Sequence, residues 1–320
     1  MAEQSDTPRI VCVTLSSAVD RTLEVRGLEL GQHAKGRLVS RHPAGKAVNV
    51  ARVLQHLGQG CVLTGFVGET ERAMFEKSFD TALVRTQLFG LDVPTRENIT
   101  LVDPEAGLET HVRDEGPEIS ADDQDRLVRK LRILAMPNIW LVFAGSLPRG
   151  LDVGRFREML RAVMDRGARV VLDSSEGALG VVQDMPVWLI KPNRAELAAL
   201  SGRKTDTSDD ILRAADSVKQ FARMVLVSAG ADGCYLIEGD AVLHGHMKDL
   251  PKRIANTVGS GDALLAGFLA ARAGGADPEG CVRHAVATAT SACLQLQAGE
   301  VDPAEVPALA GQVAVDRLAG

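Results

Sequence analysis

The chain has 320 residues, of which 45% are hydrophobic, and its formal net charge is −6. This length and composition are enough to bury a large core, so a globular protein is expected. The acidic balance argues against a nucleic-acid partner, and no segment approaches the roughly 18 apolar residues that a membrane span needs.

The N-terminus and the cysteines favour a cytoplasmic protein. Residues 1–6 lack the charged-then-apolar pattern of a secretion signal. The five cysteines are odd in number and have no metal-binding spacing. We therefore expect reduced thiols, mostly in the core.

The first part of the chain begins with a buried strand and then changes character. The apolar run Ile10–Leu15 is typical of a buried strand, and Ser16–Asp20 follows it. Two segments, Thr22–Val25 and Arg37–Ser40, alternate like half-exposed strands. Beyond Lys46, apolar residues recur at helical spacing until Gly58, which predicts a helix.

A second region repeats this half-exposed signature. Cys61–Val67 predicts a buried strand, and an amphipathic helix is expected at about 71–81. Ile99–Leu101 and Thr110–Val112 then predict a hairpin. Pairing about 18–42 with about 95–115 gives a small sheet outside the main domain, which could act as a lid.

From Ser120 onward, helical and strand-like segments alternate. Such alternation predicts β-α-β units, a mainly parallel sheet and ligands at the carboxyl ends of its strands. The fold class is therefore α/β, and residues 1–320 contain no repeat or flexible linker that would divide them into several domains. The segments are 127–134, 139–144, 156–164, 170–173, 187–190, 211–221 and 225–228.

The segment Asn256–Phe268 combines a glycine turn with the start of an apolar helix. Gly259 and Gly261 let backbone N–H groups converge, and the helix start adds its positive dipole end, so an anion is expected there. Asp262 could accept a proton from a hydroxyl beside that anion. Alternatively, its carboxylate could simply cap the helix.

The residues after each predicted strand are small, glycine-bearing or charged. Together with the helix start they suit a polyphosphate and Mg²⁺. The chain has no Walker-type glycine loop and no dinucleotide fingerprint, so a nucleotide would be bound in another way. The segments are 16–20, 145–148, 173–175, 191–196 and 229–233.

These motifs resemble those of the ribokinase-like (PfkB) carbohydrate kinases over about residues 10–300. Ala44–Ala51 is similar to the amino-terminal signature, Thr257–Asp262 to the carboxyl-terminal signature, and Lys191–Glu196 to the nucleotide and magnesium motif. The segments 14–20, 95–98, 144–148 and 172–175 resemble the branch that phosphorylates ketohexose phosphates, which includes the 1-phosphofructokinases and the tagatose-6-phosphate kinases.

The resemblance implies a ribokinase-like αβα sandwich with a β-sheet lid, and it implies site residues. Asp262 would be the catalytic base, and the backbone N–H groups of Gly259, Ser260 and Gly261 would form the anion hole. Asn193 and Glu196 would hold Mg²⁺ through water. The sugar phosphate would be bound by Asp20, Gly45, Lys46, Asn49, Arg96, Asn98 and Ser146, and ATP by Lys191, Asn193, Ser228, Gly230, Gly233 and Thr257, with adenine toward 285–291.

The types of these residues suit phosphoryl transfer, which depends on positioning and electrostatics. An aspartate with its ordinary pKa is ionised at neutral pH, as a base must be. Lys46 and Arg96 are cations that could hold the phosphate group of the substrate and close the site over it. A sugar without that phosphate is expected to bind weakly.

The chain departs from the family pattern at two places. Similar proteins have Asn-Pro where this chain has Ser16-Ser17, and a second glycine where it has Ala47. A serine can still donate a hydrogen bond to a sugar, with shorter reach, while alanine adds a methyl group where close approach or a positive φ could be required.

The predicted activity is ATP-dependent and Mg²⁺-dependent phosphorylation of a ketohexose phosphate, with fructose 1-phosphate as first choice and fructose 1,6-bisphosphate as product. Tagatose 6-phosphate and fructose 6-phosphate are the next substrates, and a kinase of an unphosphorylated sugar or nucleoside is a further alternative. A catalytically silent sugar-phosphate sensor is the alternative from another class. The resemblance also implies a homodimer formed through the lid, and activation by a monovalent cation is left open.

A pair of histidines lies outside these motifs. His244 and His246 are two residues apart and could bind a metal, but no third ligand stands near them in the sequence. A surface strand or turn is therefore the preferred interpretation.

Overall fold

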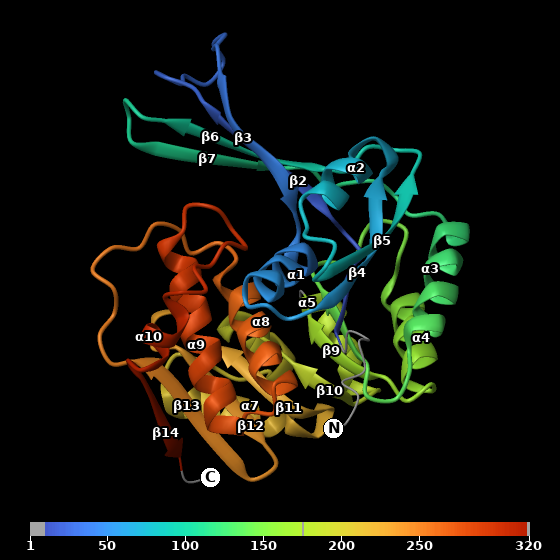
Figure 1. The fold of residues 1–320 in the computed structure, drawn as a ribbon, viewed down its shortest axis with the longest axis vertical. Coiled ribbons are helices and arrows are strands. Elements are labelled where there is room, and N and C mark those ends of the chain that lie inside the picture. The colour runs from blue at the N-terminus through green and yellow to red at the C-terminus, as the bar shows by residue number, and fades with distance from the viewer. Residues whose placement is uncertain (1–9, 175, 319–320) are drawn as a thin grey trace.

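A computed structural model describes residues 10–174 and 176–318, and within them the chain forms two β-sheets and the helices around them (Figure 1). Residues 1–6 and Ser175, which entered the sequence argument, lie outside the described residues. The helices are α1 (Lys46–His56), α2 (Glu69–Lys77), α3 (Ala121–Leu134), α4 (Val153–Met164), α5 (Glu176–Leu179), α6 (Arg194–Ser201), α7 (Ser208–Val218), α8 (Ser260–Ala273), α9 (Pro278–Leu294) and α10 (Val306–Ala310).

The larger sheet has ten strands in the described residues. From β11 to β5 the neighbouring strands are parallel, whereas β12, β13 and β14 extend the sheet in antiparallel fashion. The predicted mainly parallel sheet is thus confirmed. The order is β14 (Val313–Leu318), β13 (Ala241–Met247), β12 (Cys234–Glu238), β11 (Ala222–Ser228), β10 (Val187–Ile190), β9 (Arg169–Asp173), β8 (Trp140–Ala144), β1 (Ile10–Thr14), β4 (Cys61–Gly68) and β5 (Val84–Leu91).

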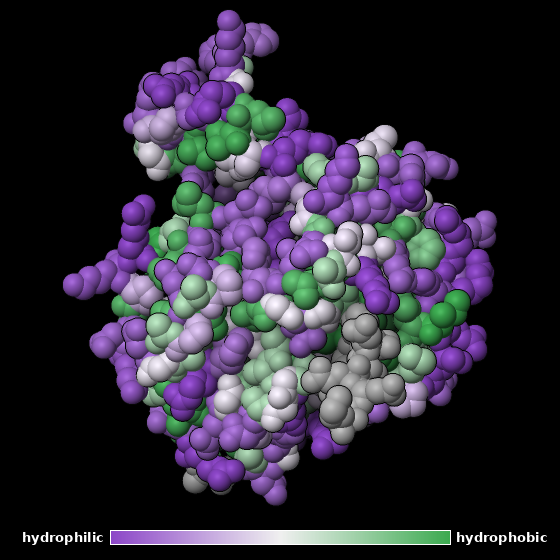
Figure 2. Space-filling model, in the orientation of Figure 1, coloured by the Kyte–Doolittle hydropathy of each residue, from purple (hydrophilic) through white to green (hydrophobic). Residues whose placement is uncertain are grey.

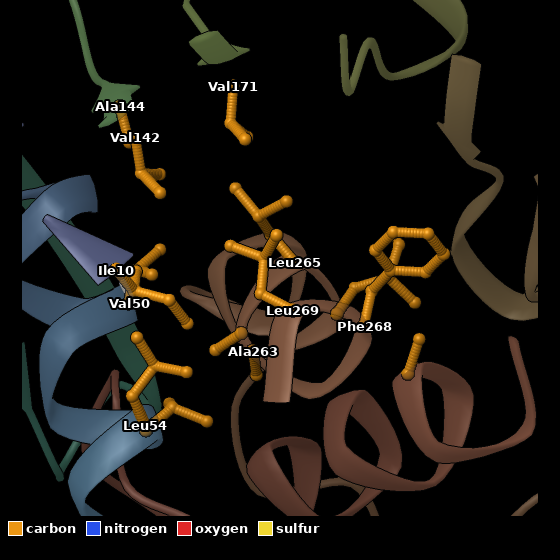
Figure 3. Packing of buried hydrophobic residues seen from close by; sticks show 14 of the residues in the cluster. Ile10, Val50, Leu54, Val142, Ala144, Val171, Ala263, Leu265, Phe268 and Leu269 are labelled. Atoms are coloured by element: carbon orange, nitrogen blue, oxygen red, sulfur yellow. The ribbon is translucent and has the colours of Figure 1, made fainter. Parts of the chain in front are cut away.

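Helices cover both faces of this sheet. One core layer joins the sheet to α1, α2, α8, α9 and α10, and the other joins it to α3, α4, α5, α6 and α7. Figure 3 shows the first layer, where Val50 of α1 and Leu265 of α8 pack beside Ile10 of β1. Helix α8 is apolar on almost every side because it also packs against α9; a Cβ added at Gly267 would lie 2.6 Å from Thr288 Oγ1. This packing fixes the start of α8 at the sheet edge.

A second sheet of four strands projects from the main body (Figure 1). It has the order β3 (Arg37–Ala44), β2 (Ala18–Glu24), β6 (Glu97–Asp103) and β7 (Leu108–Arg113). Only β2 and β6 are parallel to each other; the two outer pairs are antiparallel. Strand β3 leads directly through Gly45 into α1, so the small sheet is joined to the beginning of that helix.

Candidate active site

The start of α8 has the geometry that the glycine pattern predicts. Gly259 is the N-cap residue, and its φ of 83° lies in the left-handed region that favours glycine. Gly261 and Asp262 follow in the first helical turn, where N–H groups have no carbonyl partner within the helix. This turn can therefore receive an anion. Asp262 is not the cap residue of this helix, because Gly259 holds that position and the Asp262 carboxylate accepts a hydrogen bond from Asn49.

Asp262 is buried and held by a residue from α1. Its side chain is only 5% exposed, and its Oδ2 accepts a hydrogen bond of 2.8 Å from Asn49 Nδ2. Burial and the neighbouring Asp173 raise the pKa of Asp262 to about 7, although Asn49, Lys46 and Lys191 act in the opposite direction. The expectation of an ordinary aspartate pKa is therefore wrong. A raised value suits a group that takes up a proton near neutral pH.

This pKa gives an expected pH dependence. A base must be ionised to accept a proton, so kcat/KM should rise with pH through about 7 and level off above it. Initial rates measured from about pH 5.5 to about pH 9 test this, because kcat/KM reports groups of the free enzyme. A profile that stays flat well below pH 6 would contradict a raised pKa at Asp262.

Two lysines converge on a second buried carboxylate, Asp173 at the end of β9. Lys46 Nζ donates to Asp173 Oδ1 at 2.9 Å, and Lys191 Nζ lies 3.2 Å from Oδ2. Asp173 is fully buried and Lys191 is 3% exposed, whereas the side chain of Lys46 is 37% exposed. Burial lowers the pKa of Lys46, but Asp173, Glu196 and Asp262 more than offset this and raise it. Both lysines are thus held beside Asp262 by an ion pair.

The lysine pair also reaches the anion-binding turn. A Cβ added at Gly261 would lie 3.4 Å from Lys191 Nζ, so glycine leaves room for that ammonium group at the start of α8. The ends of strands β9 and β10 therefore meet the starts of α1 and α8. Their side chains form one cluster of Asn49, Lys46, Asp173, Lys191 and Asp262. Such a cluster places cations around a carboxylate and a helix N-terminus, as charge stabilisation in phosphoryl transfer requires.

A separate polar group forms where the small sheet joins the body. Asn98 Nδ2 donates to Asp20 Oδ1 at 2.7 Å, and Arg96 Nη1 donates to Asn98 Oδ1 at 3.1 Å. Strands β2 and β6 place Asp20 opposite Asn98 in register. Arg96 Nε is buried and has no hydrogen-bond partner among residues 10–174 and 176–318. An unsatisfied guanidinium donor of this kind is able to bind an anion.

A pocket of about 290 Å³ opens on the other side of the α8 start. Ser228, Gly230, Gly233 and Thr257, all predicted for the nucleotide, line it, as do Ser260 and Gly261. Val286, Ala289 and Thr290 of α9 form part of its wall, in the region where adenine is expected. A mostly apolar pocket that ends at an anion-binding turn suits a base attached to phosphates.

Asn193 and Glu196 are joined at the start of α6. Asn193 Oδ1 accepts from the Glu196 N–H and Glu196 Oε2 from the Asn193 N–H, each at 2.9 Å, which is a capping box. Glu196 is 8% exposed, and its Oε1 is not needed for the cap. A carboxylate oxygen fixed in this way fits water-mediated binding of Mg²⁺.

Some predicted positions belong neither to the cluster around Asp262 nor to the polar group of Asp20, Arg96 and Asn98. Ser146 is exposed, although it follows β8 as expected. Ser17 Oγ donates to the Phe66 carbonyl at 2.5 Å, so this hydroxyl is already committed. Ala47 lies inside α1 without a positive φ, so the positive-φ alternative is wrong, whereas a need for close approach at this position stays a prediction. Gly45 does require glycine, with a φ of 120°.

Sequence reasoning missed two parts of the site. Asp173 is predicted only as a strand-end residue. Its signal is an acidic residue that directly follows an apolar strand, and such a residue could have been paired with Lys46 and Lys191. The apolar wall formed by Met247, Leu250, Pro251 and Ile254 was also missed. These four residues lie on β13 and the loop after it, a region without helical or strand periodicity in most of its length.

Several known proteins have sequences or folds similar to those of this chain. The chain is 33% identical over 314 residues to the 1-phosphofructokinase of Rhodobacter capsulatus, covering 98% of this chain and 99% of that protein. It is 31% identical over 313 residues to the 1-phosphofructokinase of Vibrio cholerae, covering 98% of each. Its fold matches a crystal structure of phosphofructokinase-2 from Escherichia coli in complex with potassium, with a TM-score of 0.88, 23% identity and coverage of 95% and 99%.

These matches agree with the predicted ribokinase-like architecture and with a sugar-phosphate kinase. No helix among the described residues 10–174 and 176–318 is long and apolar enough to cross a membrane. A family model described as pfkB family carbohydrate kinase matches residues 8–305, almost the whole chain. With this match and the site geometry together, the chain belongs to the pfkB family of carbohydrate kinases.

Proposed function

We propose that this protein transfers the γ-phosphoryl group of ATP to a free hydroxyl of fructose 1-phosphate, giving fructose 1,6-bisphosphate and ADP. The observation that carries the proposal is the buried Asp262, hydrogen-bonded to Asn49 at the start of α8 and next to the Lys46–Asp173–Lys191 cluster. The choice of sugar is supported by the 1-phosphofructokinases that this chain resembles over nearly its full length.

In the proposed reaction, Asp262 orients the attacking hydroxyl and accepts its proton at a carboxylate oxygen. The Asn49 amide contacts Oδ2 of Asp262, so we assign this contact to the other carboxylate oxygen. The N–H groups of Gly259 to Asp262 and the ammonium group of Lys191 stabilise the charge on the transferred group, because they are fixed before the reaction begins. Phosphoryl transfer needs little more from a protein than such positioning.

We assign the nucleotide to the pocket beside α8, with Ser228, Gly230, Gly233 and Thr257 around it. Gly233 is also required by the packing of the backbone, because a Cβ at this position would lie 2.0 Å from the Gly245 carbonyl oxygen. Asn193 and Glu196 are proposed to bind Mg²⁺ through water, and the ion would neutralise charge on the phosphates when bound.

Lys46 and Arg96 are proposed to hold the phosphate group that the substrate already carries, with Asp20, Asn49, Asn98 and Gly45 around the sugar. The ammonium group of Lys46 uses one of its three N–H groups for Asp173. Arg96 is anchored by Asn98, and its Nε has no partner in the part of the chain that the structure describes. Each cation therefore retains donors for a dianion.

Arg96→Ala is expected to lower kcat/KM for fructose 1-phosphate by about 10- to 100-fold, because one or two charge-assisted hydrogen bonds to the phosphate are lost. Turnover of unphosphorylated fructose, if measurable, should change little. Arg37→Ala is the matched control, since Arg37 is 69% exposed and pairs with Glu24 on the small sheet. Survival of full activity in Arg96→Ala would favour a kinase of unphosphorylated sugars.

The small sheet is proposed to be a lid over this single kinase domain and also a dimer interface. Its exposed hydrophobic side chains include Leu38, Val39, Leu108 and Val112, and Figure 2 shows hydrophobic surface on the side of this sheet that faces the body. Sedimentation velocity should give a dimer for the native chain and a larger monomer fraction for Val39→Asp, whose charge would be buried in the interface. A native monomer would contradict the interface.

Other sugar phosphates and another class of function make different predictions. Tagatose 6-phosphate or fructose 6-phosphate could use the same cations, so only direct comparison separates them from fructose 1-phosphate. A silent sensor would bind sugar phosphate without turnover. The intact turn at Gly259 and Gly261 and the well-positioned Asp262 argue against the sensor.

A further inference from the structure

His244 and His246 project from the same face of β13, where the proposed kinase reaction does not use them. Gly245 between them faces α9, because a Cβ at Gly245 would lie 2.3 Å from Val282 Cγ1. Alternate residues of a strand point to opposite faces, so both histidines lie on the other side of the sheet. There β14 brings Asp316 opposite His244 in register. The predicted surface strand is thus confirmed as β13, and Asp316, which lies 70 positions from His246, supplies a third possible ligand that the neighbouring sequence does not contain.

The three side chains form a compact group that solvent can reach. One ligand atom from each residue lies within 4.8 Å of those of the other two. His246 Nε2 is 3.1 Å from Asp316 Oδ2, and these side chains are 33% and 57% exposed. Two tetrahedral zinc ligands with bonds of about 2.0–2.1 Å are about 3.3 Å apart, so this pair already has that spacing. Rotation of the exposed Asp316 side chain can adjust the distance between its carboxylate and the His244 ring.

Outer hydrogen bonds limit which ring nitrogens are free to bind a metal. His244 Nε2 must donate to the Asp232 carbonyl at 2.8 Å, which leaves Nδ1 with its lone pair. His246 Nδ1 must donate to the Met247 carbonyl at 3.2 Å, which directs Nε2 toward Asp316. Histidines that bind metals usually donate their second N–H to a carbonyl in this way. The His244 ring is further held by stacking on Tyr235, with centroids 4.2 Å apart.

We propose that His244, His246 and Asp316 form a Zn²⁺ site on the outer face of β13 and β14. Two imidazoles and one carboxylate are the ligands of many zinc centres with an open fourth position, which water would fill here. When Nδ1 carries the only proton of His246, its Nε2 lone pair faces a carboxylate oxygen of Asp316 3.1 Å away, and a shared metal ion satisfies both atoms.

His244 connects the proposed Zn²⁺ site to the loop that lines the proposed nucleotide pocket. Its N–H holds the carbonyl of Asp232, the last residue of the 3-10 turn η3 (Gly230–Asp232), and Gly230 lines the pocket. Metal binding at Nδ1 makes Nε2–H a stronger donor, so it should hold this loop more firmly. This consequence rests on the proposed function, whereas the metal site itself does not.

Binding of Co²⁺ and Zn²⁺ to the purified full chain, stripped of metal, tests the site. Co²⁺ should bind with 1:1 stoichiometry and give visible absorption typical of tetrahedral nitrogen and oxygen coordination, and Zn²⁺ should displace it. His246→Gln and Asp316→Asn should each weaken binding by at least about tenfold. His111→Gln is the matched control, because His111 is exposed and lies 3.8 Å from Glu109 with no second histidine in that pair.

Absence of stoichiometric Co²⁺ binding would overturn the proposal, as would unchanged binding in His246→Gln when circular dichroism shows that this variant is folded. The link to the nucleotide loop has its own readout. Calorimetry should show tighter Mg-ADP binding to the Zn²⁺-loaded native chain than to the metal-free chain, and no such difference in His246→Gln. Equal affinities in the native chain would overturn the link.

Discussion

Asp262→Asn is expected to lower kcat by about 10²–10⁴-fold, the range that general base catalysis commonly contributes. The amide has nearly the shape of the carboxylate but cannot accept the proton of the attacking hydroxyl. The anion-binding turn and the pocket are left intact, so affinity for Mg-ADP should stay within a few-fold of the native value. Steady-state rates and calorimetry on the same preparation measure the two effects separately.

Asp122→Asn serves as the control, because Asp122 is exposed in the first turn of α3. Unchanged turnover in Asp262→Asn would remove Asp262 from the role of base. A parallel loss of nucleotide affinity would show instead that the substitution had damaged the start of α8.

Asp173→Asn is expected to have the second large effect, because it leaves Lys46 and Lys191 without their shared counter-ion. Breaking a buried ion pair on one side costs about 3–5 kcal/mol. The lower end applies here, since Lys46 is 37% exposed and partly screened. The free energy of unfolding, measured with urea, should therefore fall by about 3 kcal/mol.

The same variant should move the acid limb of kcat/KM to lower pH. Asp173 raises the pKa of Asp262 by repelling its ionised form, so removing this charge lowers that pKa. Asp173→Asn combined with Lys191→Met removes both partners of the most buried pair, and it should be more stable than the sum of the two single changes predicts. Simple additivity, or an acid limb that moves to higher pH, would contradict this account of the cluster.

The parallel part of the fold could be predicted because its signals are local. Strands β1, β8 and β10 are short apolar runs, and the left-handed Gly259 is marked by the glycines around it. By contrast, β5 contains Arg85 and Gln87 and has no clear periodicity. Strand β14 was missed for a related reason, since it is the edge strand of the larger sheet and carries the exposed polar residues Asp316 and Arg317. Strand β12 was also missed, although it is a buried apolar run between β11 and β13.

The contacts within the site could not be predicted from spacing. Asp173 meets Lys46 across 127 positions and Lys191 across 18, and only the sheet order places them together. Asp316 lies 70 positions from His246, on a strand that reaches β13 only in the folded sheet. The raised pKa of Asp262 depends equally on burial, which a sequence motif does not contain.

The most direct test of the central claim is ADP release from the purified protein with Mg-ATP, measured by a coupled assay. The substrates are fructose 1-phosphate, tagatose 6-phosphate, fructose 6-phosphate and the corresponding free sugars, each in potassium and in sodium buffers. The account predicts the highest kcat/KM for fructose 1-phosphate and little turnover of the free sugars. Turnover of free sugars alone, or no turnover with any of them, would contradict it.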